Sequence, residues 1–258
     1  MKFNEIIEKN LSESKEARKI LTKKESIVVG NKKNDKMGLY LSNYANCLLN
    51  RQIDIFDDTL FLLSNNRIQS ACIISRGMIE TYAFAKLLAT KITKILTEKQ
   101  GKKSVEESLK IILDFTNSSR FKVTEQKKVD KGIFDLNDYK FTEQAKDRMI
   151  NFLASSEHVM NALRSLYQEE IKHTKGKESQ FEFTYDVLSE WVHPSQTSVF
   201  HYYTPETHNV PTSQGTVHLY DNAKAACAKS LHFITDCKNI YEWLIELADE
   251  INKRASKF

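Results

Sequence analysis

Two charged side chains of opposite sign lie in an apolar stretch, one helical turn apart. Arg76 and Glu80 belong to residues 66–89, with apolar residues on both sides of the pair. On a helix they share a face, and either charge would be costly to bury alone. The pair predicts a fixed guanidinium that holds a phosphate or carboxylate, oriented by Glu80. The alternative is an internal ion pair that positions neighbouring helices. Gly77, inside the same turn, indicates that another backbone or a ligand comes close.

A second polar group follows within residues 181–195. Tyr185 and Ser189 share one helix face, and Ser189 and His193 are again one turn apart. Pro194 disfavours helical geometry at the residue before it, so His193 is expected at the very end of the helix. The helix macrodipole would favour the protonated imidazole there, which suits a general acid or an anion-binding cation. The structural alternative is that His193 caps the last carbonyls of the helix.

The remaining histidines give a weak metal signal. His201, His208 and His218 have spacings that match no helical zinc motif. The sequence contains no GxxxxGK[ST] phosphate loop, GxGxxG, HExxH or GxSxG pattern. We therefore expect no metal and no cofactor. A metal-dependent enzyme that uses residues 201–218 stays open as a third hypothesis.

Composition favours one soluble helical domain. Only 7 Gly and 3 Pro occur among 258 residues, so most of the chain lacks the turn residues that short strands need. The net charge of +4 is compatible with a polyanionic partner but does not indicate one. No apolar run is long enough to span a bilayer, and no export signal is visible. The four cysteines have no CxxC spacing, which predicts reduced, buried thiols in a cytoplasmic protein.

Hydrophobic spacing predicts the helices. We expect an all-α, up-and-down bundle of long helices in a single domain, residues 1–258, with a peripheral N-terminal helix within 1–30. Residues 118–141 are expected to form a loop insertion, and residues 195–220 a small irregular or hairpin insertion. Ser104 begins a capping-box pattern, and Asp221 is expected to cap the last helix. The predicted helices cover residues 1–24, 39–64, 66–89, 104–117, 142–173, 181–193 and 221–251.

Two short patterns in this chain resemble a known family. The R-x-x-x-E pattern is formed by Arg76 and Glu80, and it is followed far downstream by Y-x-x-L-S-x-x-x-H-P-S, formed by Tyr185, Leu188, Ser189, His193, Pro194 and Ser195. Together, over roughly residues 39–195, they are similar to a branch of bacterial helical proteins that look like distant HEPN proteins. HEPN proteins are helical bundles, often dimeric, and many are metal-independent ribonucleases in toxin and defence systems. Their arginine and histidine usually share one helix, whereas here Arg76 and His193 would come from two.

The resemblance implies the first hypothesis, a metal-independent ribonuclease-type effector of a bacterial toxin or anti-phage defence system. Catalytic residues would be His193 for proton transfer, Arg76 for phosphate charge and Glu80 to orient Arg76. Substrate contacts are expected from the side chains of Tyr185, Ser189, Ser195 and Tyr82. Expected partners are RNA, a partner or antitoxin protein and a second copy of the chain, with no membrane.

The second hypothesis is a non-catalytic helical module that binds a protein or a nucleotide. In this case Arg76, Glu80 and His193 form a structural polar network. Stability separates the two hypotheses, because residues of a structural network should lower the melting temperature when replaced, whereas catalytic residues should lower activity alone.

Overall fold

The computed structural model describes residues 3–25, 37–116, 157–200, 209–212 and 215–258. Helices dominate these ranges, as the all-α prediction requires, and one short hairpin is present. The elements in chain order are α1 (Phe3–Lys19), α2 (Gly38–Ser64), α3 (Ile68–Glu98), α4 (Gly101–Thr116), α7 (Val159–Thr174), α8 (Gln180–Glu190), α9 (Gln196–Phe200), β1 (Asn209–Thr212), β2 (Gly215–His218), α10 (Leu219–Leu231) and α11 (Ile234–Ala255).

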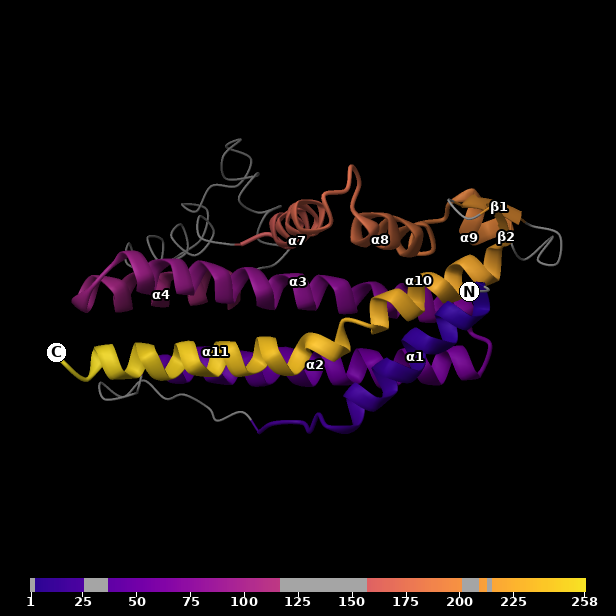
Figure 1. Ribbon diagram of the computed structural model, residues 1–258. Helices are drawn as coiled ribbons and strands as arrows, with labels where there is room; N and C mark the ends of the chain where they lie inside the picture. Colours follow the sequence, from indigo (N-terminus) through magenta and orange to yellow (C-terminus); the bar gives the residue numbers. More distant parts are fainter. Residues whose placement is uncertain (1–2, 26–36, 117–156, 201–208, 213–214) are drawn as a thin grey trace, which may run out of the picture.

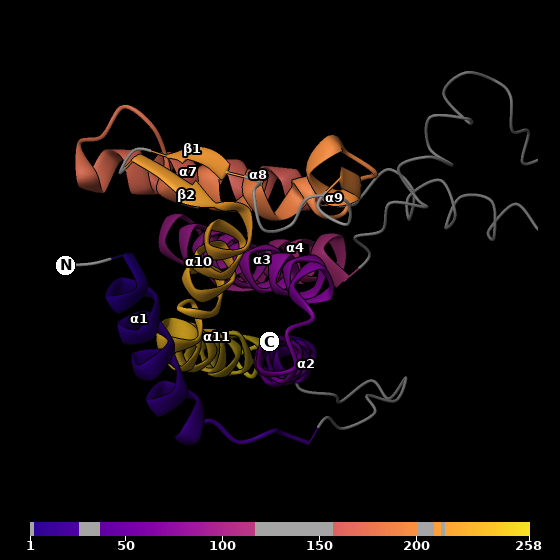
Figure 2. The same cartoon turned by 90° about the vertical axis from the view of Figure 1, so that its right-hand side faces the viewer.

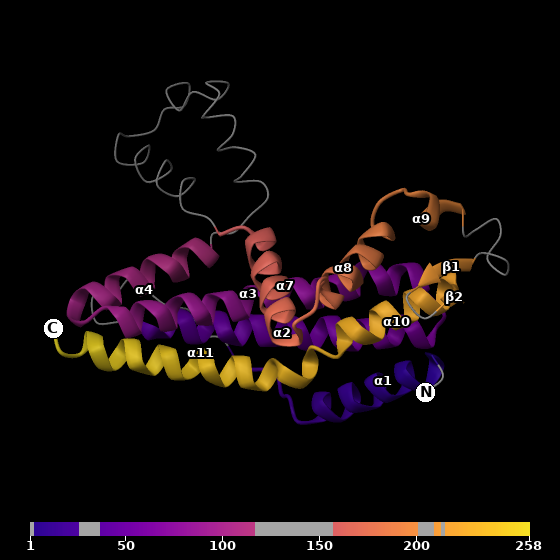
Figure 3. The ribbon, with the colours of Figure 1, turned by 45° about the horizontal axis from the view of Figure 1, so that its top comes forward.

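The helices lie in stacked layers (Figures 1 and 2). Helices α2 and α11 run side by side in the lower layer, and α3 and α4 lie above them, with α10 rising from α11 towards the hairpin. The upper layer holds α7, α8, α9 and the hairpin, and α7 crosses α3 at a steep angle (Figure 3). Helix α3 therefore has neighbours on several sides, as its apolar residues predict.

Helix α3 is longer than predicted. The sequence indicated an end near Ala89 and a polar connector, but the helix continues to Glu98. Ile92 and Leu96 are buried and extend the apolar stripe, so the helix continues despite Lys91 and Lys94 in this segment. The prediction for Ser104 was also wrong, because α4 begins at Gly101 and the Ser104 hydroxyl donates to the Gly101 carbonyl from inside the helix.

The predicted last helix is divided into α10 and α11. Phe233, at the junction, is buried, and its ring centroid lies 4.6 Å from that of Tyr82 and 4.8 Å from that of Phe181. Packing of this ring between α3 and α8 accounts for the bend, which spacing alone did not indicate. The start was also misplaced, because His218 rather than Asp221 caps α10 by accepting a hydrogen bond from the Tyr220 amide at 3.3 Å.

The hairpin confirms the predicted insertion. Strands β1 and β2 pair antiparallel, from Asn209 opposite His218 to Thr212 opposite Gly215. At the N-terminus, α1 packs on α10 and α11, and Arg18 donates two hydrogen bonds to Asp57 of α2, at 2.9 and 2.7 Å. The predicted loop insertion at 118–141 lies outside the described residues.

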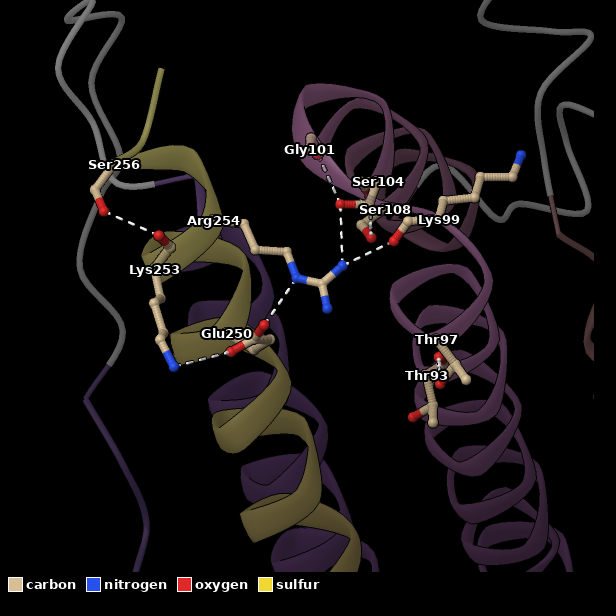
Figure 4. A network of polar contacts seen from close by, with 10 residues as sticks. All are labelled: Thr93, Thr97, Lys99, Gly101, Ser104, Ser108, Glu250, Lys253, Arg254 and Ser256. Carbon is tan, nitrogen blue, oxygen red and sulfur yellow. Dashed lines mark hydrogen bonds and ion pairs between the residues drawn. The ribbon is translucent and has the colours of Figure 1, made fainter.

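The end of the bundle where α11 finishes is closed by a polar network, which Figure 4 shows. Arg254 Nε donates to Glu250 Oε1 at 2.8 Å, and Nη1 donates to the Lys99 carbonyl at 3.0 Å and to Ser104 Oγ at 3.2 Å. Lys99 is the C-cap residue directly after α3, so its carbonyl has no partner within the helix. Arg254 thus joins α11 to the turn between α3 and α4.

Candidate functional site

The structure brings three of the predicted site residues together on α3 and α8. Arg76 Nε donates to Glu80 Oε1 at 2.9 Å, and the Tyr185 hydroxyl donates to the same oxygen, also at 2.9 Å. The Arg76 guanidinium carbon lies 4.9 Å from the centre of the Tyr185 ring, within cation–π range. We call Arg76, Glu80 and Tyr185 the Arg76 cluster.

The Arg76 cluster is open to solvent on its charged side. The side chains of Arg76 and Glu80 are 23% and 24% exposed, whereas Tyr185 is buried. Burial first, and then the negative charge of Glu80, raise the pKa of Tyr185 to about 12, while Arg76 acts in the opposite direction. Tyr185 is therefore a neutral donor at physiological pH. A partly hydrated ion pair of this kind remains accessible to a ligand.

Gly77 has a packing role where α3 faces α2. A Cβ atom at this position would lie 3.2 Å from Ile55 Cδ1 and 3.5 Å from Arg51 Nη2, both on α2. Arg51 Nε also donates to Thr81 Oγ1 at 3.1 Å. The close approach predicted at Gly77 is therefore made by side chains of α2 rather than by a backbone or a ligand.

His193 lies three residues beyond the end of α8, not at its last residue as the sequence predicted. Helix α8 ends at Glu190, and residues 191–194 form a turn in which the His193 side chain is exposed. The His193 carbonyl accepts hydrogen bonds from the Ser195 amide, at 2.7 Å, and from the Ser198 hydroxyl. In the described part of the chain, no hydrogen bond or ion pair links its imidazole to the Arg76 cluster. His193 therefore lies beyond the last turn of α8 rather than within it.

The other hydroxyls predicted to bind substrate have partners within the protein. Ser189 donates to the Tyr185 carbonyl of its own helix at 2.8 Å, and Tyr82 donates to Asp236 Oδ2 at 2.6 Å. Ser195 donates to the Glu190 carbonyl at 2.9 Å and accepts from the Ser198 amide at the start of α9. These bonds shape the turn after α8 and join α3 to α11.

Tyr167 was not among the site residues that the sequence predicted. The structure places it on α7 with 6% of its surface exposed, and its hydroxyl has no hydrogen-bond partner in the described part of the chain. Burial raises the pKa of Tyr167, followed by the effects of Tyr185 and Asp186 on α8. A tyrosine in an apolar helix stripe was the available signal, since a buried phenol normally needs a partner.

The described ranges also show where possible metal ligands and the four cysteines lie. No group of three or more His, Cys, Asp or Glu side chains is arranged there to hold a metal ion, and His201 and His208 lie outside those ranges. Cys72, Cys227 and Cys237 are buried as predicted, but Cys47 is exposed, so that part of the prediction was wrong. Cys47 lies outside the buried apolar stripe of α2. No described helix has both the length and the hydropathy needed to cross a membrane.

Comparison with known proteins places the chain in a family. No curated protein and no solved structure matches it. A family model, described as a family of unknown function, DUF5677, matches residues 42–209. The matched segment includes α3, α7 and α8, and therefore all residues of the Arg76 cluster, together with Tyr167 and His193. Because the match covers more than half of the chain, the protein belongs to the DUF5677 family of unknown function.

Proposed function

We propose that this protein is a helical binding module for ribonucleotides, free or within single-stranded RNA. The observation that carries the proposal is the partly exposed Arg76 guanidinium, held over the Tyr185 ring and fixed by Glu80. A guanidinium held in this way is pre-organised to bind a phosphate. A cytoplasmic location and a homodimeric state belong to the same proposal.

The two charges of the cluster favour a ligand with both acceptors and donors. Arg76 uses Nε for Glu80, and its side chain remains partly exposed, so a phosphate could approach its terminal nitrogens. Among the described residues, Glu80 accepts the hydrogen bonds from Arg76 and Tyr185 through Oε1, which leaves Oε2 for a ligand donor. A ribonucleotide offers an anionic phosphate together with hydroxyl and amino donors. A simple anion would meet repulsion from Glu80.

Calorimetric titration of the purified protein with the four 5′-ribonucleoside monophosphates tests this proposal. Arg76→Ala should weaken the binding of the preferred nucleotide about tenfold or more, because one charge-assisted hydrogen bond and the stacked cation are lost. Arg67→Ala is the matched control, because Arg67 is an exposed arginine at the start of the same helix. Absence of binding by the wild type, or equal binding by both variants, would refute the proposal.

The second candidate is the ribonuclease-type effector implied by the HEPN resemblance. One observation favours it: the His193 imidazole is exposed and makes no hydrogen bond or ion pair within the described ranges, so it is available to a substrate. In this reaction His193 would transfer the proton, and Arg76 would stabilise the phosphate charge. Incubation with single-stranded RNA in a chelating buffer tests it. Cleavage by the wild type and its loss in His193→Ala are expected, and intact RNA in both cases would exclude this candidate.

Melting temperatures complete the comparison of the two candidates. A purely structural role predicts that Arg76→Ala lowers the melting temperature while ligand binding stays unchanged. A binding role predicts the reverse, with a small thermal effect and a large loss of affinity. The exposed His193 side chain predicts almost no thermal effect of His193→Ala under either candidate.

A further inference from the structure

The Tyr167 hydroxyl is a buried polar group without a partner among the described residues. The residue is 6% exposed, and its hydroxyl is shielded from solvent. A buried hydroxyl that lacks a hydrogen bond destabilises a protein by about 1–3 kcal/mol. Because phenylalanine would fill the same space without this cost, the hydroxyl calls for a function.

The position of α7 brings Tyr167 close to the two helices that supply the Arg76 cluster. Helix α7 packs against both α3 and α8 (Figure 3), the two helices that supply the cluster. An ion pair joins it to α3, between Lys86 Nζ and Glu169 Oε1 at 2.7 Å. Glu169 lies two residues beyond Tyr167 on the same helix. The Tyr167 side chain is buried in this packing.

The packing of α7 and the acidic groups near Tyr167 indicate what kind of ligand group would fit beside it. Tyr167 is buried on α7, which packs on the two helices that supply the Arg76 cluster, α3 and α8. After burial, the groups that raise the pKa of Tyr167 are Tyr185, Asp186, Glu182 and Glu80, which belong to α8 and to the Arg76 cluster. The same acidic groups would repel a phosphate at this point. An uncharged part of a ligand fits beside Tyr167 better than an anionic part.

We propose that the Tyr167 hydroxyl is the inner contact of the ribonucleotide site and hydrogen-bonds the nucleoside part, while Arg76 holds the phosphate at the solvent side. This inference rests on the proposed function and assigns the two ends of the ligand. Tyr167 is then a specificity residue, which separates a nucleotide from phosphate alone. Loss of a buried hydrogen bond of this kind commonly weakens binding about tenfold.

Calorimetry with the preferred 5′-ribonucleoside monophosphate, and phosphorus NMR titration with inorganic phosphate, test the assignment. Tyr167→Phe should weaken nucleotide binding about tenfold and leave the affinity for inorganic phosphate unchanged. Arg76→Ala should weaken both. Tyr241→Phe is the matched control, because its half-buried hydroxyl donates to Asn46 Oδ1 at 3.0 Å, on α11 and α2. That control should bind both probes like the wild type.

Each outcome separates the two proposals. If the wild type binds no nucleotide, the proposed function fails and the role of Tyr167 fails with it. If Arg76→Ala loses binding while Tyr167→Phe retains full nucleotide affinity, only the inference about Tyr167 is overturned. A second measurement on the wild type avoids dependence on variants: the ¹³Cζ signal of Tyr167 should shift when nucleotide is added. An unmoved signal at saturation would also overturn the inference.

Discussion

Two regions of the bundle each contain an arginine and a glutamate one turn apart, together with a tightly packed glycine. The closed end comprises Gly38, Lys99, Ser104, Glu250 and Arg254, and the other region is the Arg76 cluster with Gly77 beside it. The Nε–Oε1 distances of the two ion pairs are 2.8 and 2.9 Å, and the arginine side chains are 18% and 23% exposed. Similar local geometry therefore occurs in two different surroundings.

The difference lies in what else each guanidinium contacts. Arg254 also donates to a helix-terminal carbonyl and to the Ser104 hydroxyl (Figure 4), and its glutamate precedes it, the more favourable order on a helix. Arg76 precedes its glutamate and adds only the ring of Tyr185. An arginine that satisfies backbone groups supports the fold, whereas one placed on a ring beside solvent is suited to a ligand.

Gly38 at the closed end and Gly77 beside the Arg76 cluster also differ in what lies against them. A Cβ atom at Gly38 would lie 2.0 Å from the Ala248 carbonyl oxygen, and the Gly38 amide donates to Asn252 Oδ1 at 2.8 Å. At Gly77 the nearest atom is the end of an isoleucine side chain, 3.2 Å away. Backbone cannot move aside as easily as a terminal methyl group. The closed end is thus much less tolerant of added atoms.

The largest expected effect is that of Gly38→Ala. The added methyl group would push α2 away from α11, and overpacking against backbone should lower the free energy of unfolding by about 3 kcal/mol. For a chain of this size the melting temperature should fall by about 10 °C. Differential scanning calorimetry measures it. An unchanged melting temperature would show that α2 and α11 are not in this contact.

Arg254→Ala should have the next largest effect. It removes charge-assisted hydrogen bonds to Lys99 and Ser104 and leaves the end of α3 without its partner, which should cost about 2 kcal/mol in a urea titration. Arg76→Ala should cost no more than about 1 kcal/mol, the sum of a helix-surface ion pair and a cation–π contact. Equal losses in the two variants would remove the distinction between the regions.

Much of the fold follows from the sequence. The apolar spacing gave α2, α3 and the helical class, and the change of composition after Ser195 gave the hairpin. The positions that failed depend on tertiary contacts: Ile92 and Leu96 extend α3 through lysines, and Phe233 bends the last helix by packing between α3 and α8. Such contacts involve residues far apart in the chain, which local spacing does not encode.

The candidate site was predictable only in part. The i, i+4 spacing paired Arg76 with Glu80, and the sequence also selected Tyr185. The relation of Tyr185 to Glu80 depends on how α8 packs on α3, and no local rule supplies it. The same holds for Tyr167, whose spacing is that of a core residue. Sequence spacing also could not predict that Arg254 donates a hydrogen bond to the Lys99 carbonyl at the end of α3.

Acidification should weaken the contact that Glu157 makes with Lys91 of α3 and Asn161 of α7. This contact lies between the closed end and the Arg76 cluster. Although burial opposes it, hydrogen bonds from Lys91 and Asn161 lower the pKa of Glu157 below its ordinary value of 4.5. Because the unfolded chain then takes up the proton first, the stabilisation is present above pH 4.5 and is lost as the pH falls below it. Urea midpoints from pH 7 to pH 3 measure this loss.

Glu157→Gln should flatten that dependence on pH. Glu250→Gln, at the closed end, is the control: the hydrogen bond from Arg254 also lowers the pKa of Glu250, but its side chain is 38% exposed and solvent weakens its contribution. The flattening should therefore be smaller. An equal or larger flattening in Glu250→Gln would place the main acid-sensitive contact at the closed end instead.

The smallest expected effect is that of Gly77→Ala, and it sharpens the comparison most directly. Alanine is favoured over glycine in a helix by about 1 kcal/mol. The tight contact of its methyl group with Ile55 Cδ1 should destabilise the fold by a similar amount. The net change in the free energy of unfolding should stay within about 0.5 kcal/mol. Nucleotide binding should be unchanged, because the added methyl group faces α2 rather than the Arg76 cluster. A loss of binding with normal stability would mean that a ligand approaches α3 at Gly77, from the side that α2 now covers.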